Sequence, residues 1–490
     1  MRRRAVLACA VCAAGGVLLA ADPPPDAAAP VSPKSLPPIS ENSEGRRPLP
    51  ISLPTAFRLA DARALDVALA AARVRAAAAA LDRAELLWLP NIVIGSDYTR
   101  HDGQIQDIRG NVFGTSRSSV FLGAGPNLNV AVADALFVPL SARQIVRSRQ
   151  ADLQATANDT LLSVSESYFN LQQARGELSG AESNVRAAED LVRRTEALAQ
   201  GLAPPVEANR ARAELSRRRQ TVASLRERWL TASAELARIL RLDVAAQIEP
   251  VESPALQITI IDPTMSVDDL IPIGLTYRPE LASRQALVQA ALAQLRQERL
   301  RPLVPSVLLR GISTSNPGLA GGVFGGGENS HVGNFSARSD WDVQLVWELQ
   351  NLGLGNRARV RERRAEYEAA LIDVFRVQDR VAAEVAQAFA QVQSARARQV
   401  EAAAGLREAQ DTLAKSIEGL SQTRRVGEFL ILIVRPSEAV QAVQALAQAY
   451  TDFYAAVADY NRAQFRLYRA LGHPAQCLAS LVPELPAPAP

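Results

Sequence analysis

One long pattern occurs twice in this chain, and each copy has two strand-like stretches followed by a helical stretch with apolar residues at seven-residue steps. The first series is Val164, Leu171, Leu178, Val185 and Val192, and the second is Val385, Val392, Leu406, Leu413 and Leu420. The two series superpose at an offset of 221 residues. A sustained heptad predicts helices whose apolar seams face one another in a coiled coil. The duplication therefore predicts one extended unit with two related halves.

Composition excludes several other classes of protein. Aromatic residues make up 5% of the chain, which suits long helices packed closely on small side chains. The formal net charge is only +3, so no nucleic acid partner is expected. After the N-terminus, no stretch approaches the roughly 20 apolar residues that a membrane-spanning helix needs.

The N-terminus is typical of an export signal, with three arginines, a short apolar core and small residues at Ala20 and Ala21. A lipid anchor at Cys12 is an alternative, but the residues before it do not fit one. The predicted order of segments is signal 1–21, Pro/Ala-rich leader 22–50, first repeat 51–243, linker 244–263, second repeat 264–472 and Pro-rich tail 473–490.

Each repeat is expected to begin with a helix that ends at a proline, Pro90 or Pro305. The predicted strands are 91–101 and 118–137 in the first repeat, and 306–313 and 336–349 in the second. The glycine-rich stretch 318–333 is interpreted as a mobile loop. Strands of about ten residues are long enough to cross a bilayer at a tilt. An ordinary β-hairpin in a soluble domain is the alternative.

The number of strands decides what such a membrane protein must do. Four strands cannot close a barrel, and an open sheet edge in lipid leaves backbone groups unpaired. Three chains would supply twelve strands, which is within the range of membrane barrels. The predicted fold class is therefore mostly α with a membrane β-barrel portion, in which a trimer completes a 12-strand barrel and an α-helical tunnel.

Three local segments strengthen this interpretation. They are residues 201–208, with a glycine-led turn before an acidic residue, residues 347–356, where the second hairpin re-enters the helices, and residues 460–472 of the closing helix. In this order, behind an export signal, they resemble the TolC-type outer membrane efflux protein family over about residues 51–472.

The resemblance implies a homotrimeric outer membrane channel with a periplasmic helical extension. Such a channel works passively, with a periplasmic adaptor protein and an inner-membrane pump as partners. The adaptor would contact the hairpin tips. By position these tips are Gly201, Leu202, Ala203, Pro204 and Pro205, and Val426, Gly427, Glu428, Phe429 and Leu430. The apolar run at the second tip has the alternative role of packing against the neighbouring hairpin.

The family narrows its pore near the tips with acidic residues, and the matching positions here are Glu207, Arg435 and Glu438. Arg435 stands where the family often has an acid, which puts an acidic ring in doubt. Ordinary solvated helix residues are the alternative. Tyr98, Trp341 and Trp347 are candidates for an interfacial aromatic girdle, as is Trp88, although burial between helices and strands would also explain the tryptophans.

No enzyme is expected, because the sequence has no catalytic constellation, phosphate-binding loop or metal-ligand cluster, and no cofactor is predicted. Two other classes compete with the channel. A periplasmic adaptor normally carries one helical hairpin, and a coiled-coil scaffold would leave the alternating strands unexplained. Both are therefore weaker explanations of this sequence.

Overall fold

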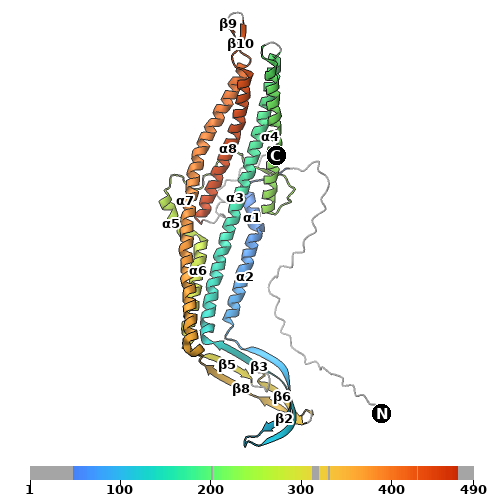
Figure 1. The fold of residues 1–490 in the computed structure, drawn as a ribbon, viewed down its shortest axis with the longest axis vertical. Coiled ribbons are helices and arrows are strands. Elements are labelled where there is room, and N and C mark those ends of the chain that lie inside the picture. The colour runs from blue at the N-terminus through green and yellow to red at the C-terminus, as the bar shows by residue number, and fades with distance from the viewer. Residues whose placement is uncertain (1–47, 200–201, 312–318, 329–330, 427–428, 473–490) are drawn as a thin grey trace, which may run out of the picture. The chain divides into compact units, whose positions relative to one another are not determined.

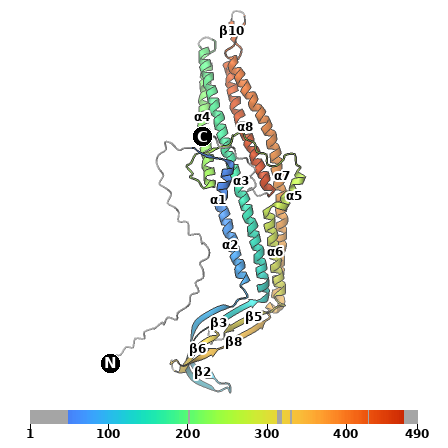
Figure 2. The same cartoon turned by 180° about the vertical axis from the view of Figure 1, so that it is seen from behind.

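The structure is a computed structural model that describes residues 48–199, 202–311, 319–328, 331–426 and 429–472. The predicted export signal, nearly all of the leader and the tail lie outside these residues. Residues from Pro48 onward form one compact unit, with a curved sheet at one end and helical hairpins at the other (Figures 1 and 2).

The order of elements repeats and so confirms the predicted duplication. The first repeat contains β1 (Leu49–Ile51), α1 (Leu53–Arg63), α2 (Leu65–Glu85), β2 (Asn91–Gln106), β3 (Val112–Ala131), α3 (Val132–Leu198) and α4 (Pro205–Leu240). The second contains β4 (Ile248–Pro250), α5 (Val267–Tyr277), α6 (Pro279–Leu300), β5 (Ser306–Gly311), β6 (Gly321–Glu328), β7 (Gly333–Ser339), β8 (Trp341–Val346), the 3-10 turn η1 (Gln350–Gly353), α7 (Leu354–Gly419), β9 (Thr423–Val426), β10 (Phe429–Leu432) and α8 (Pro436–Ala470).

The first helix of each repeat is broken, where the sequence predicts one continuous helix. The breaks fall at Ala64 and Arg278, and both residues have extended backbone with ψ of 121°. Pro279 explains the second break, because a proline disfavours helical conformation in the residue before it. Ala64 adopts the same conformation without a proline after it.

The long helices α3 and α7 have 67 and 66 residues, so each is about 100 Å long at 1.5 Å per residue. Their heptad seams are largely buried, including Val164, Leu171, Val385 and Val392 at 0% exposure. The strand predicted to reach residue 137 ends instead at Ala131. The helix begins at Val132 and accommodates Pro139 in its interior.

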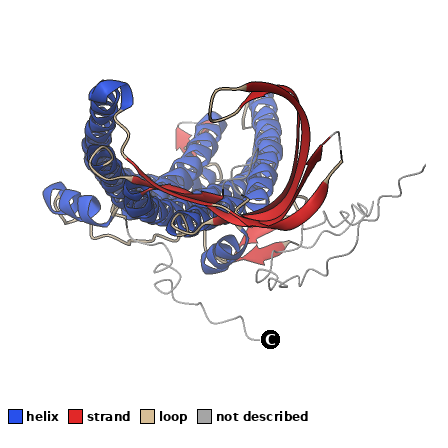
Figure 3. Ribbon diagram, turned by 90° about the horizontal axis from the view of Figure 1, so that it is seen from below, coloured by secondary structure: helices blue, strands red, loops and turns tan. Residues whose placement is uncertain are grey.

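Strands β2, β3 and β5 to β8 form one antiparallel sheet that is strongly curved (Figure 3). Strand β3 pairs with β2 on one side, and with β6 and then β5 on the other; β7 pairs with β6, and β8 with β5. The four predicted strands are therefore four passages across the sheet, of which the last two are each divided into two strands.

The interpretation of the glycine-rich stretch as a loop was wrong for residues 321–328, which form β6. These glycines allow neighbouring backbone segments to approach closely, and they do not form a mobile loop. A Cβ on Gly322 would lie 2.1 Å from the carbonyl oxygen of Leu122, and a Cβ on Gly327 would lie equally close to that of His331. Larger residues would force the strands apart.

Between the sheet and the tips, the helices pack around an aromatic core that includes Phe57, Phe169 and Phe465. Here β1 and β4 pair in parallel and join the end of the predicted leader to the linker. The buried Glu252 carboxylate accepts the backbone N–H of Leu53 at 2.9 Å and the hydroxyl of Tyr168. Burial, together with that carboxylate, raises the pKa of Tyr168 above its usual value.

A cluster of five charged side chains joins four helices at the same level. Arg278 contacts Glu384 at 2.6 Å and Glu280 at 3.1 Å, and Arg469 contacts Asp159 at 2.5 Å and Glu280 at 2.8 Å. Burial acts to lower the pKa of Arg469, but the carboxylates outweigh it and raise the pKa above its usual value. We call these residues the equatorial charge cluster.

Replacing Arg278 by Ala should destabilise the helical part strongly, because the Arg278 side chain is 3% exposed and its loss leaves Arg469 to balance Glu280, Glu384 and Asp159. Removing one partner of a buried ion pair lowers the free energy of unfolding by about 3 kcal/mol or more. Thermal unfolding followed by circular dichroism at 222 nm measures this. The matched control is Arg364→Ala, whose pair with Glu368 is largely exposed and contributes little. Equal melting temperatures for the two variants would contradict the prediction.

Candidate functional site: the sheet faces, the sheet edges and the hairpin tips

The register of the sheet places apolar side chains on one continuous face, because paired residues point the same way and neighbours alternate. This apolar face consists of Ile92, Ile94, Tyr98, Val120, Leu122, Leu128, Val130, Val307, Leu309, Val323, Phe335, Trp341, Val343 and Leu345. Many of these side chains are strongly exposed in the single chain, including Ile94 at 78% and Val343 at 68%. An exposed apolar surface that crosses every passage of a sheet indicates a surrounding that is itself apolar.

The opposite face is mainly polar and makes hydrogen bonds and ion pairs with itself, although Phe121 and Phe324 also pair on it. Arg310 contacts Asp342 at 2.9 Å, and the hydroxyls of Thr99 and Ser119 lie 2.6 Å apart. Further polar members are Asp97, Arg117, Asn127, Asn129, Glu328, Arg338 and Gln344. Membrane barrels have this division, with an apolar outer band and a polar interior.

The sheet does not close on itself. Within the described residues, β2 on one side and β7 and β8 on the other have no strand partner along their outer edges. Each edge presents a row of backbone donors and acceptors, which cannot stay unpaired in lipid.

Of the aromatic girdle candidates, Tyr98 and Trp341 lie on the apolar face within the sheet. Trp88 and Trp347 instead lie at the junction with the helices, just outside β2 and β8, and are 64% and 57% exposed. Burial within the chain therefore does not explain these two tryptophans, and a girdle role stays a prediction.

The first predicted tip connects α3 to α4. Leu202 and Ala203 donate their backbone N–H groups to the carbonyl of Leu198 at 2.8 and 2.9 Å, and α4 begins at Pro205. Leu202 is 45% exposed, whereas Gly201 lies outside the described residues. The tip thus presents an apolar side chain on a tight helical turn.

The second tip differs by a feature that sequence reasoning missed. Its extra residues form the two-stranded ribbon of β9 and β10, in which Thr423 pairs with Leu432. The predicted turn residues Gly427 and Glu428 lie outside the described part of the chain. The same holds for the side chains of Val426, Phe429 and Leu430, so their role as an adaptor contact stays a prediction.

The candidate constriction residues occupy helix N-termini. Glu207 and Glu438 both stand two residues after the proline that begins α4 or α8, and Arg435 is the N-cap of α8. Glu438 accepts the backbone N–H of Arg435 at 3.3 Å, and Glu207 pairs with Arg210 at 2.7 Å. Carboxylates in a first turn stabilise a helix, which accounts for both acids locally. Still, Oε2 of Glu207 is buried with no hydrogen-bond partner in the chain.

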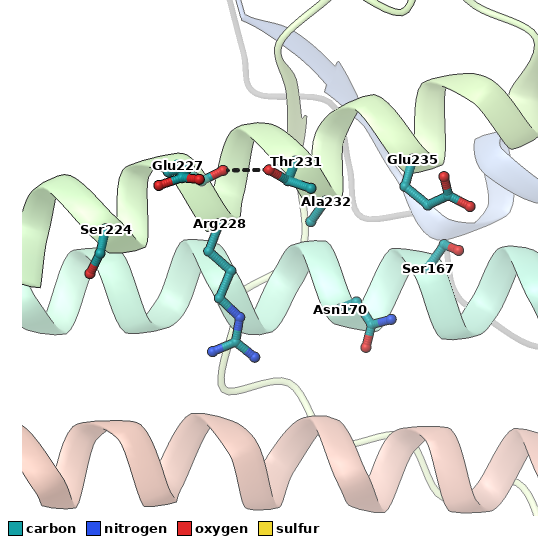
Figure 4. A pocket seen from close by; sticks show the side chains of 8 residues that line it. All are labelled: Ser167, Asn170, Ser224, Glu227, Arg228, Thr231, Ala232 and Glu235. Atoms are coloured by element: carbon teal, nitrogen blue, oxygen red, sulfur yellow. Dashed lines mark hydrogen bonds between the residues drawn. The ribbon is translucent and has the colours of Figure 1, made fainter.

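A groove among the helices lies between α3 and α4 and has a volume of about 610 Å³. Its walls carry Ser167, Asn170, Ser224, Glu227, Arg228, Thr231, Ala232 and Glu235 (Figure 4). Arg228 extends across α3 and pairs with the buried Glu177 at 2.6 Å, and Glu235 pairs with Arg238 at 2.6 Å.

The described residues lack two features, a membrane-spanning helix and a metal-binding cluster. No helix there combines the length and the apolarity needed to cross a membrane. In the same residues, no group of three or more His, Cys, Asp or Glu side chains is placed to bind a metal ion.

Residues 56–240 match the sequence profile of a family described as outer membrane efflux protein. The matched stretch covers most of the first repeat, and the duplicated fold extends the same architecture through the second.

Solved channels of low sequence identity share the fold. The outer-membrane channel OprN superposes with a TM-score of 0.67 at 20% identity, over 86% of this chain and 89% of that chain. The CmeC outer membrane channel of Campylobacter jejuni gives 0.68 at 16% identity, over 86% and 85%. The MtrE outer membrane channel of Neisseria gonorrhoeae, solved in its open state, gives 0.67 at 16%, over 86% and 88%. No curated protein sequence matches this chain significantly.

Placing an arginine on the apolar face of the sheet should block membrane assembly. Val343→Arg puts a charge toward lipid, at a cost of roughly 2–4 kcal/mol near the bilayer midplane, and an oligomer would repeat that cost. The matched control is the neighbouring Gln344→Arg, whose side chain lies on the polar face. Membrane fractionation should show that Val343→Arg is depleted from the outer membrane while Gln344→Arg is retained. Equal retention would show that the apolar face does not contact lipid.

Proposed function

We propose that three copies of this protein form a channel through the outer membrane. The observation that carries the proposal is a sheet with an apolar and a polar face and two unpaired edges. Joining β2 of one chain to β7 and β8 of the next pairs both edges, and three chains give twelve passages. The polar faces then enclose a water-filled pore.

The long helices suit the same assembly. Exposed apolar side chains remain on α2 and α7, among them Leu65, Leu69, Ile372 and Phe375. In a trimer these side chains can pack between chains, so that the helices continue the barrel as a tunnel about 100 Å long. Conduction through such a water-filled polar lumen is passive. The chain itself therefore needs no energy source.

The direction of transport and its driving force would come from partners. A periplasmic adaptor protein and an inner-membrane pump are the partner classes, and the hairpin tips are the surface for the adaptor. The exposed Leu202 at the first tip and the exposed Ile433 beside the ribbon at the second support that assignment. A periplasmic adaptor or a soluble scaffold is a poorer explanation, because neither needs an exposed apolar sheet face.

The trimer should survive extraction in detergent. On an unheated gel, the protein from the outer membrane should run as a trimer and collapse to a monomer on boiling. The same preparation should conduct ions across a planar lipid bilayer. A monomeric periplasmic protein without conductance would refute the channel.

We expect Glu207→Gln to reduce the preference of the channel for cations, because in a trimer this carboxylate occurs three times at one height. Glutamine keeps an oxygen that can accept a hydrogen bond from Arg210, so stability should change little. Reversal potentials in a salt gradient measure the effect. Glu235→Gln, at an exposed position near the far end of α4, is the matched control. An unchanged reversal potential for Glu207→Gln would leave this residue as an ion-pair partner of Arg210 in the first turn of α4 and remove it from the constriction.

A further inference from the structure

The apolar face of the sheet is too short on strand β2 to cross a membrane by itself. Its apolar side chains run from Ile92 to Tyr98, and the next side chains on that face, Arg100 and Asp102, form an ion pair at 2.6 Å. The apolar part is about 20 Å long along the strand, which is about 16 Å of height at a tilt of roughly 40°. Membrane barrels have an apolar band roughly 25 Å tall, so about 9 Å of it must come from another part of the chain.

The missing part lies on the side of the helices, because charged residues end the apolar face on the other side. At the junction between sheet and helices, large apolar side chains are exposed in both repeats, including Trp88 at 64%, Leu303 at 71% and Leu349 at 65%. Trp347 and Leu349 continue the alternation of β8, which places them on the side of the apolar face. We call this set the junction collar, and its members are Leu86, Trp88, Leu89, Leu303, Trp347 and Leu349.

Just beyond the collar, arginines gather at the start of α7. Arg357, Arg359 and Arg361 are exposed, and among the described residues none of them has a carboxylate partner. The two arginines that follow are different, because each pairs with a glutamate of the same helix. Cations in the first turns of a helix lie near the positive end of its dipole, so these three arginines do not stabilise the helix. They are therefore available to an anion from outside the chain.

Two further arginines lie at the same junction. Arg83 is in the last turn of α2 and Arg299 in the last turn of α6, and both are exposed. Neither has an ion-pair partner in the part of the chain that the structure describes. The carboxylates near this level that lack a cation are fewer, namely Asp82, Glu348 and Glu362. We call the five arginines the basic rim, which consists of Arg83, Arg299, Arg357, Arg359 and Arg361.

The depth of the basic rim matches the headgroup layer of a bilayer. Arg357 and Arg361 lie about 5 and 10 Å beyond Leu354 at 1.5 Å per residue. The headgroup layer is roughly 5–8 Å thick on each side of the hydrocarbon. Leu354 is 66% exposed and lies on the same helix face as both arginines, because the three residues are spaced by three and four. Apolar and basic side chains thus follow one another along this face, in the order that a membrane surface requires.

We propose that the junction collar and the basic rim bind anionic phospholipid in the periplasmic leaflet of the membrane. The collar contacts the acyl chains, and the arginines donate charge-assisted hydrogen bonds to the phosphate groups. Arginine suits this role because its planar guanidinium group can donate two hydrogen bonds to one phosphate. This inference rests on the proposed channel function, because it needs the sheet to lie in a bilayer.

Arg357→Gln combined with Arg361→Gln tests the site, because it removes two charges and keeps two polar side chains. Native mass spectrometry of the purified trimer in detergent measures the binding of added phosphatidylglycerol, which is anionic, and of phosphatidylcholine, which is zwitterionic. The wild type should prefer phosphatidylglycerol on the order of tenfold, and the double variant should lose most of that preference. The matched control is Arg396→Gln with Arg407→Gln, at exposed positions of the same helix far from the sheet, and it should keep the preference.

Two further measurements separate the lipid from other anions. Inorganic phosphate at millimolar concentration should not displace phosphatidylglycerol, because phosphate has no acyl chains for the collar to hold. Displacement would show a site for free phosphate and overturn the lipid site. The unheated gel tests a second explanation, in which these arginines pair with carboxylates of a neighbouring chain. A double variant that no longer forms the trimer would assign the arginines to that contact and overturn the lipid site.

The outcomes separate this inference from the proposed function. A wild type that forms no trimer or does not conduct refutes the channel itself. A conducting wild-type trimer that binds both lipids equally, or a double variant that keeps the preference, overturns the lipid site and leaves the channel intact.

Discussion

The need to pair every backbone polar group inside a membrane is the constraint on which the proposed channel depends. A sheet of four passages with an apolar outer face is stable in lipid only when its edges are joined to those of other chains. Each copy of the repeated unit supplies two of these passages with the same alternation. In the proposed trimer, each long helix follows a strand of the sheet, so the position of that strand sets the place of the helix around the ring.

Much of the fold was predictable because it rests on periodicity. The heptad residues Val164, Leu171, Val385 and Val392 are all fully buried, as the seven-residue spacing indicates. The alternation from Trp341 to Leu345 predicted one apolar and one polar face, and the register shows both. Pro90 and Pro305 correctly marked the positions after which β2 and β5 begin.

The incorrect predictions share a physical cause, because tertiary contacts determined the local structure at these positions. Strand β6 is rich in glycine and carries almost no side-chain pattern, so only its pairing with β3 reveals it. The sequence predicted a strand to residue 137, but helix α3 begins at Val132, and its packing against its neighbours outweighs the hydrogen bond lost at Pro139. At the second candidate tip, a two-stranded ribbon of four-residue strands has too short a pattern to recognise.

The two junctions between sheet and long helix have unequal mechanical properties. Helix α3 starts at Val132 directly after β3 ends at Ala131, so torsion in that strand passes straight into a stiff rod. Helix α7 is preceded by Asn351, Leu352 and Gly353, all with positive φ, and these residues form a swivel between β8 and the helix. In the proposed channel, a twist of the helices at the tips would therefore reach the sheet through the first repeat and be absorbed by the second.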